Sequence, residues 1–144
     1  MAASSREERI ALTESTWRAY SEGDLERVLA TLDPEVVVHV PVELANSGTY
    51  RGREEFVRWI GAWLEAWESF DMEVVDTIPV GDHHVVSHMS QTGVGRGSGI
   101  EVNQELGWVF EFRDGLAVYI GLRGGVESAL VTAREREEIA FRDG

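Results

Sequence analysis

The alternation of side-chain types between Ser98 and Leu122 constrains the fold more than any other feature of this sequence. The even-numbered positions form an almost wholly apolar row, namely Ile100, Val102, Gln104, Leu106, Trp108, Phe110 and Phe112. The other parity is mostly polar, with Glu101, Asn103, Glu105, Gly107, Val109 and Glu111. Because side chains alternate between the two faces of a strand, the pattern predicts one long strand with a buried face and a solvent-exposed face. Asp114-Gly115 then predicts a tight hairpin turn, and Leu116 to Leu122 predicts the partner strand.

Gln104 is the exception in the apolar row. A buried amide must either find a hydrogen-bond partner or face a cavity. We expect Gln104 and Trp108 to face a pocket, where the amide would both donate to and accept from a ligand. The alternative is that Gln104 bonds a neighbouring backbone group.

Three helices are predicted before most of the strands. Ser5 can cap the first, and one face of that helix carries Ile10, Trp17 and Tyr20. After the Gly23-Asp24 break, a second helix ending at Pro34 has apolar residues at helical spacing, namely Leu25, Val28, Leu29 and Leu32. The third helix has the strongest stripe, formed by Phe56, Trp59, Ile60, Trp63, Leu64 and Trp67.

Further strands are expected at 36–42, 72–78 and 84–92, and a glycine-rich connection at 93–99. A charged helix at 127–138 and a polar tail end the chain. Helices fall early and antiparallel strands late, which is an α+β pattern. We therefore predict a single domain over residues 1–144, in which a curved antiparallel sheet wraps around three N-terminal helices and leaves a cone open at one end.

The composition excludes several classes of function. The net charge is −13, and all 13 basic residues are arginines. This balance disfavours nucleic acid and anionic membranes as partners. Without lysine or cysteine, Schiff-base chemistry, phosphate-binding P-loops, thiolate nucleophiles and zinc–thiolate sites are excluded. We expect no cofactor and, because no signal-like or membrane-spanning apolar run occurs, a cytoplasmic protein.

Several short motifs, in order, resemble a known superfamily. They are Tyr20-Ser21-Glu22-Gly23-Asp24, Asp33-Pro34-Glu35, Tyr50-Arg51-Gly52, Gly95-Arg96-Gly97-Ser98-Gly99, Phe112-Arg113-Asp114-Gly115 and Glu127-Ser128-Ala129-Leu130. Together they resemble the nuclear transport factor 2-like superfamily, in its SnoaL-like polyketide cyclase and ketosteroid isomerase branch, over about residues 8–133. The resemblance implies a cone-shaped pocket and a homodimer formed through the sheet. It does not imply one reaction, because this fold hosts many functions.

The acids of these enzymes have no counterpart at the matching positions. Thr16, Val40 and Trp108 stand where ketosteroid isomerases carry a tyrosine and two aspartates, and Gly125 stands nearest to the aspartate of the polyketide cyclases. The resemblance therefore does not imply the familiar ketosteroid isomerase chemistry.

Two histidines remain as candidate catalytic residues. His88 and His39 lie within predicted strands, where a pocket imidazole would act as a general base near neutral pH. The alternative places His88 on the sheet surface, and His39 on the outer sheet face or against a dimer partner. His83 and His84, beside the Gly81-Asp82 turn, are expected in solvent, as is Glu111. No histidine spacing suggests a metal site.

The candidate ligand-binding residues are Trp17, Tyr20, Trp59, Trp63, Gln104 and Trp108. Pockets are lined mainly by apolar and aromatic groups with a few polar ones. The alternative for the tryptophans and Tyr20 is simple core packing. We expect the cone to bind a small, largely apolar molecule, with a possible isomerase, cyclase or hydrolase step. The competing hypothesis is a non-catalytic binding or dimerisation module.

Overall fold

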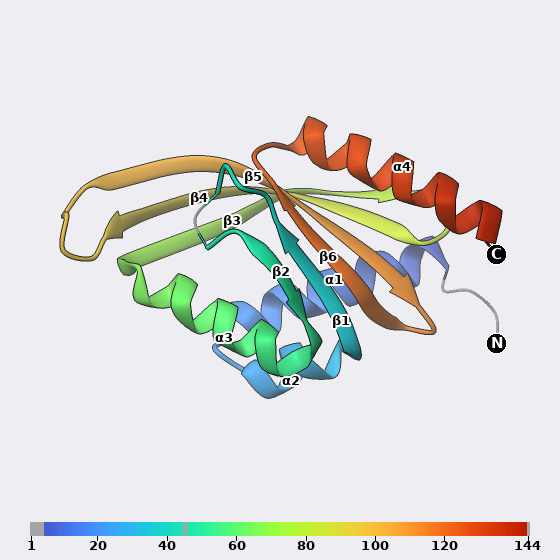
Figure 1. Cartoon of the computed structure of the whole chain (residues 1–144), viewed down its shortest axis with the longest axis horizontal. Coiled ribbons are helices and arrows are strands. Elements are labelled where there is room, and N and C mark those ends of the chain that lie inside the picture. The colour runs from blue at the N-terminus through green and yellow to red at the C-terminus, as the bar shows by residue number, and fades with distance from the viewer. Residues whose placement is uncertain (1–4, 45, 144) are drawn as a thin grey trace.

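Helices lie on both sides of a curved sheet. The computed structural model describes residues 5–44 and 46–143. Within them, α1 (Arg6–Ser21), α2 (Leu25–Ala30) and α3 (Gly52–Glu65) lie on one side of the sheet, and α4 (Val126–Asp143) lies on the other (Figure 1). Ser5 caps α1 as expected, because its hydroxyl accepts a hydrogen bond from the Glu8 amide. We call the sheet face under α1–α3 the inner face and the face under α4 the outer face.

Six strands form the sheet in the order β2-β1-β6-β5-β4-β3. Their bounds are β1 (Leu32–Val40), β2 (Gly48–Arg51), β3 (Trp67–Val80), β4 (His84–Gly95), β5 (Glu101–Arg113) and β6 (Leu116–Arg123). The predicted α+β fold with a curved, unclosed sheet is confirmed. One detail is corrected, since β1 pairs parallel to β6 and only the other neighbours are antiparallel.

The predicted hairpin joins β5 to β6. Asp114 and Gly115 have φ angles of 52° and 80°, the left-handed conformation that a two-residue hairpin turn requires. Next to the turn Phe112 pairs with Ala117, and a register shift between Glu111 and Phe112 then places Phe110 opposite Ile120 and Trp108 opposite Leu122. The alternating row therefore reaches the inner face, as the pattern predicted.

Several predicted boundaries were wrong. Leu32 begins β1 rather than ending a helix, because α2 stops at Ala30. Trp67 begins β3 rather than extending α3; its indole covers Gly93, where an added Cβ would lie 2.7 Å from Trp67 Cε3. Gly93 and Gly95 belong to β4, so only the second half of the glycine-rich stretch forms a connection. The short β2 lies within a predicted loop.

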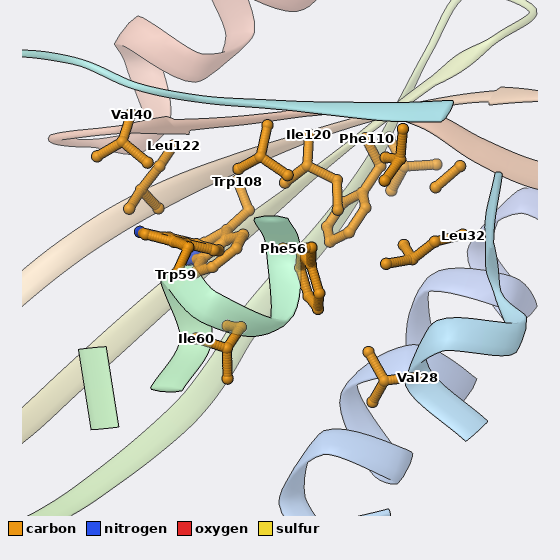
Figure 2. Close-up of a cluster of buried hydrophobic side chains, with 14 of the residues drawn as sticks. Val28, Leu32, Val40, Phe56, Trp59, Ile60, Trp108, Phe110, Ile120 and Leu122 are labelled. Carbon is orange, nitrogen blue, oxygen red and sulfur yellow. The ribbon is translucent and has the colours of Figure 1, made fainter. Parts of the chain in front are cut away.

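The main core fills the inner face. Trp59 and Ile60 of α3 pack against Trp108, Phe110 and the β1 and β6 side chains, while Val28 joins from α2 (Figure 2). The ring centroids of Trp59 and Trp108 are 5.8 Å apart. This packing holds α3 over the middle of the sheet.

Beneath α4, the outer face is not the solvent-exposed surface that the alternation predicted, whereas Glu101, Asn103 and Glu105 of β5 are exposed as expected. Ala129 and Ala133 of α4 are fully buried against Val86, Val109 and Tyr119. Beneath α4, Glu111 is 5% exposed and His84 is 0% exposed. The expectation that these two side chains are solvated was wrong, because a sheet pattern does not reveal that a distant helix will cover the polar face.

Candidate binding cleft

A cleft of about 720 Å³ lies between the helices and β3. Its walls come from the end of α1, the start of α2, the exposed side of α3 and the edge strand β3. Most of the lining side chains are apolar or aromatic, and they include Trp17, Tyr20, Leu25, Val28, Val57, Ile60, Leu64, Phe70, Met72 and Val74. We call this space the helix–β3 cleft. A volume of this size and an apolar lining are typical of small-molecule sites.

The break between α1 and α2 opens one wall of the cleft. Gly23 has a φ of 71°, which turns the chain sharply after α1. Asp24 then caps α2, since its carboxylate accepts a hydrogen bond from the Arg27 amide. The turn lets the ends of two helices face α3 and β3 instead of packing into them.

Gly61 keeps the opposite wall open. This glycine lies inside α3, where glycine costs about 1 kcal/mol relative to alanine. An added Cβ would meet nothing within 4 Å, so packing does not require a glycine there. Gly61 lines the cleft, and any longer side chain at this position would occupy cleft space.

Trp17 and Tyr20 are the predicted residues that line the cleft. Trp17 joins the cleft to the core, because its Nε1 donates to Ser87 Oγ at 3.0 Å and its ring meets Trp108 edge-on at 5.0 Å. Tyr20 is half-buried, and none of the described residues bonds its hydroxyl. Burial raises the pKa of Tyr20 to about 12, so its phenol stays neutral and can donate a hydrogen bond to a ligand.

Three charged residues contribute to the cleft lining, namely Arg18, Asp24 and Asp71. Asp24 already serves as the α2 cap. Asp71 is exposed on the edge strand. Among the described residues, no group of three or more histidine, aspartate or glutamate side chains is arranged to hold a metal ion. The polar groups of the cleft are thus suited to orienting an apolar ligand through a few hydrogen bonds.

The other predicted ligand-binding residues do not line the cleft. Trp59, Trp63 and Trp108 are 2%, 6% and 7% exposed, so they pack as core residues. Gln104 lies on the inner face but is only half-buried, opposite Gln91 of β4. It precedes Leu106 and Trp108 in β5, and it is not one of the residues that line the cleft.

The two candidate catalytic histidines lie on the outer face. His88 pairs with Gly107, and its Nε2 is 2.6 Å from Glu105 Oε1. His39 Nδ1 accepts a hydrogen bond from Arg123 at 3.3 Å. Burial and the nearby Arg123 charge lower the pKa of His39, against the opposite effect of Glu43. The sheet therefore separates both imidazoles from the helix–β3 cleft, and a catalytic role for either stays a prediction.

Sequence patterns missed the β3 wall. Phe70, Met72 and Val74 share one parity in the strand, and all three line the cleft. That alternation was a usable signal. Two features obscured it. The strand begins earlier than predicted, and a bulge between Val74 and Asp76 reverses which residues after it point to each face of the sheet.

Comparison with known proteins assigns the fold to a family. A family model for a SnoaL-like domain matches residues 13–120. The chain belongs to the SnoaL-like domain family. The resemblance read from the sequence motifs is thereby confirmed. No curated protein matches this SnoaL-like chain.

Solved structures show the same fold at low identity. An NTF2-like protein of unknown function from Burkholderia pseudomallei is 19% identical, with a TM-score of 0.74 over 86% of this chain and 95% of its own. TerC, co-crystallised with polyporic acid, is 17% identical, with a TM-score of 0.72 over 89% of this chain and 98% of its own. A putative SnoaL-like polyketide cyclase from Jannaschia is 16% identical, with a TM-score of 0.68 over 85% and 91% of the two chains. No described helix of this SnoaL-like chain is long and apolar enough to cross a membrane.

Proposed function

We propose that this SnoaL-like protein binds a small, largely apolar molecule in the helix–β3 cleft. The main observation that supports this proposal is a cleft of about 720 Å³ with a mainly apolar lining. Gly61 supports it, because a helix-destabilising residue lines the cleft at a position where an added Cβ would meet nothing within 4 Å. The TerC structure, obtained with polyporic acid, lends support by showing that a protein of this fold was crystallised with a small molecule.

The experiment is a tryptophan-fluorescence titration with polycyclic ketones, aromatic polyketides, terpenoids and epoxides. Trp17 lines the cleft and touches Trp108, so occupancy should change the emission. Two variants at one position provide the specific test. Gly61→Phe fills cleft space and should weaken binding at least tenfold, whereas Gly61→Ala adds one methyl group and should bind nearly as the wild type does.

The opposite result would locate the ligand elsewhere. Suppose that a compound binds the wild type saturably. If Gly61→Phe binds this compound as tightly as Gly61→Ala does, the helix–β3 cleft is not the binding site. If no compound in the panel binds the wild type, the hypothesis of a dimerisation module gains support. Circular dichroism on both variants checks that the helix is retained.

A second candidate is an acid–base step of the isomerase, cyclase or hydrolase kind on the bound molecule. Tyr20 favours it, since its neutral phenol lines the cleft and can donate a hydrogen bond to a carbonyl oxygen. Asp71 contributes a carboxylate to the same lining. Any compound that binds should be tested for turnover by the wild type, Tyr20→Phe and Asp71→Asn. Binding without turnover would instead support a non-catalytic carrier.

His39 and His88 provide the competing acid–base proposal. If the reaction occurs in the cleft, His88→Ala and His39→Ala should keep full turnover, because both imidazoles lie on the outer face. Loss of turnover in either folded variant would move the reaction away from the helix–β3 cleft.

A further inference from the structure

Gln91 is a buried amide whose side chain lacks any partner. It is 1% exposed, and neither its Oε1 nor its Nε2 makes a hydrogen bond in the described structure. Burying an amide without a partner is costly, so native proteins rarely keep one without a reason. Gln91 shares parity with Val85 and Met89, which belong to the inner core. The amide therefore belongs to the inner face.

The register places Gln91 directly behind the cleft wall. Its cross-strand partner on β3 is Met72, and Met72 lines the helix–β3 cleft. Paired residues on neighbouring strands project side by side from the same face. Methionine is unbranched and flexible, so the Met72 side chain can change its rotamer between the cleft and the amide.

Other donors on the inner face also lack partners. The indole Nε1 groups of Trp59 and Trp108 are buried without a hydrogen bond, and the two rings are 5.8 Å apart. An indole only donates, whereas an amide both donates and accepts. The Gln91 amide and these indoles are neutral groups, and each can donate a hydrogen bond to a neutral oxygen acceptor.

We propose that Gln91 is the polar anchor of the cleft, and that the ligand carries a carbonyl or hydroxyl oxygen on an otherwise apolar frame. The inference rests on the proposed binding function and narrows its ligand class. Met72 covers the anchor in the empty cleft and moves aside when a ligand enters. The competing explanation is that Gln91 is satisfied by water or by Gln104, its cross-strand neighbour on β5.

Two probes of nearly the same shape separate these explanations. 2-Tetralone carries one ketone oxygen, and tetralin is the corresponding hydrocarbon. We expect calorimetric titration of the wild type to show about fivefold to tenfold tighter binding of the ketone, the factor that one neutral hydrogen bond provides. Gln91→Met should bind both probes equally. Gln104→Met is the matched control and should keep the preference for the ketone.

The variant should fold, because replacing an unpartnered amide by an apolar side chain of similar length removes a desolvation cost. Thermal unfolding should show Gln91→Met to be at least as stable as the wild type. Met72→Ala tests the covering role, and we expect a several-fold faster association of the ketone.

Four results would contradict the proposal, in whole or in part. Equal binding of both probes by the wild type, or an unchanged ketone preference in Gln91→Met, would show that Gln91 is no anchor while the cleft remains a binding site. If Met72→Ala leaves the association rate of the ketone unchanged, Met72 does not cover Gln91. If neither probe binds and Gly61→Phe does not weaken the binding of any compound in the panel, both the proposed binding function and the anchor role of Gln91 are contradicted.

Discussion

His84 shows how one buried residue can hold two elements together. Its Nδ1 faces a Glu137 carboxylate oxygen of α4, and its Nε2 lies 3.0 Å from Glu111 Oε1 of β5. The two ring nitrogens thus face carboxylates from two different elements, and the ring itself is fully buried. His84 thereby joins the outer face of the sheet to α4.

We predict that His84→Ala destabilises the protein by about 3 kcal/mol or more, because it removes the buried partner that two carboxylates share. His83→Ala is the matched control, since His83 contacts the same Glu137 but is 25% exposed, and it should cost about 1 kcal/mol or less. Urea denaturation measures both. Equal losses in the two variants would contradict the special role of His84.

Glu111 predicts how the stability depends on pH. Burial alone would raise the pKa of Glu111, but the hydrogen bond and charge of His84, with Arg136 and Arg113, lower it to about 2. The pKa of Glu137 is also lowered, by His84, His83 and the Asp82 amide against the effect of burial. A carboxylate with a depressed folded-state pKa stabilises the protein above its unfolded-state pKa, and this contribution is lost as the pH falls toward the folded-state value.

The stability should therefore fall between about pH 5 and pH 2, and Glu111 alone contributes on the order of 3 kcal/mol to that fall. Denaturation curves at pH 6, 4 and 3 for the wild type and Glu111→Gln measure this contribution. The gap between the two proteins should narrow as the pH falls. A gap that stays constant over this range would contradict the assignment.

At the scale of elements, the contact between α4 and the sheet depends on small residues. Gly107 of β5 lies under Ala129, and an added Cβ would lie 2.5 Å from both the Ala129 Cβ and the Gly125 carbonyl oxygen. A charged helix with few apolar residues packs here because its alanines approach the strand backbone closely. The same closeness makes the contact intolerant of added volume.

We expect Gly107→Ala to destabilise the protein by about 1–3 kcal/mol through overpacking. Gly124→Ala, in the connection before α4, is the control, because its added Cβ would meet nothing within 4 Å. Thermal unfolding of both variants provides the comparison. If Gly107→Ala unfolds at the wild-type temperature, α4 is free to move away from β5.

At the scale of the whole molecule, α4 limits the sheet surface that is left for the homodimer that the family resemblance implies. The helix covers part of the outer face over β4, β5 and β6. We propose that a dimer through the sheet uses the strand surface beyond this helix, where His88 and Glu105 lie.

Sedimentation velocity in low and high salt tests this arrangement. Each chain carries a net charge of −13, so salt should strengthen association by screening the repulsion between copies. His88→Glu adds another negative charge to the proposed contact and should weaken the dimer. A monomer under all conditions, or a dimer indifferent to His88→Glu, would contradict the proposed surface.

Local patterns were enough to predict the elements that carry their own signal. The Asp114-Gly115 turn, the Ser5 cap and the alternating row through Trp108 all appear as predicted. Each depends on neighbours in the chain, namely a left-handed turn, a helix end and a two-residue side-chain period. Together with the motif order, they were sufficient for the fold and its family.

Contacts between distant segments decided the rest. Burial of Glu111 and His84 depends on α4, and the cleft depends on how α1, α2, α3 and β3 meet. The parity of a strand tells which residues share a face but not what will cover that face. For this reason His39 and His88 could be selected as polar strand residues, while only the tertiary structure placed them on the outer face and left Gln91 unpartnered behind the cleft.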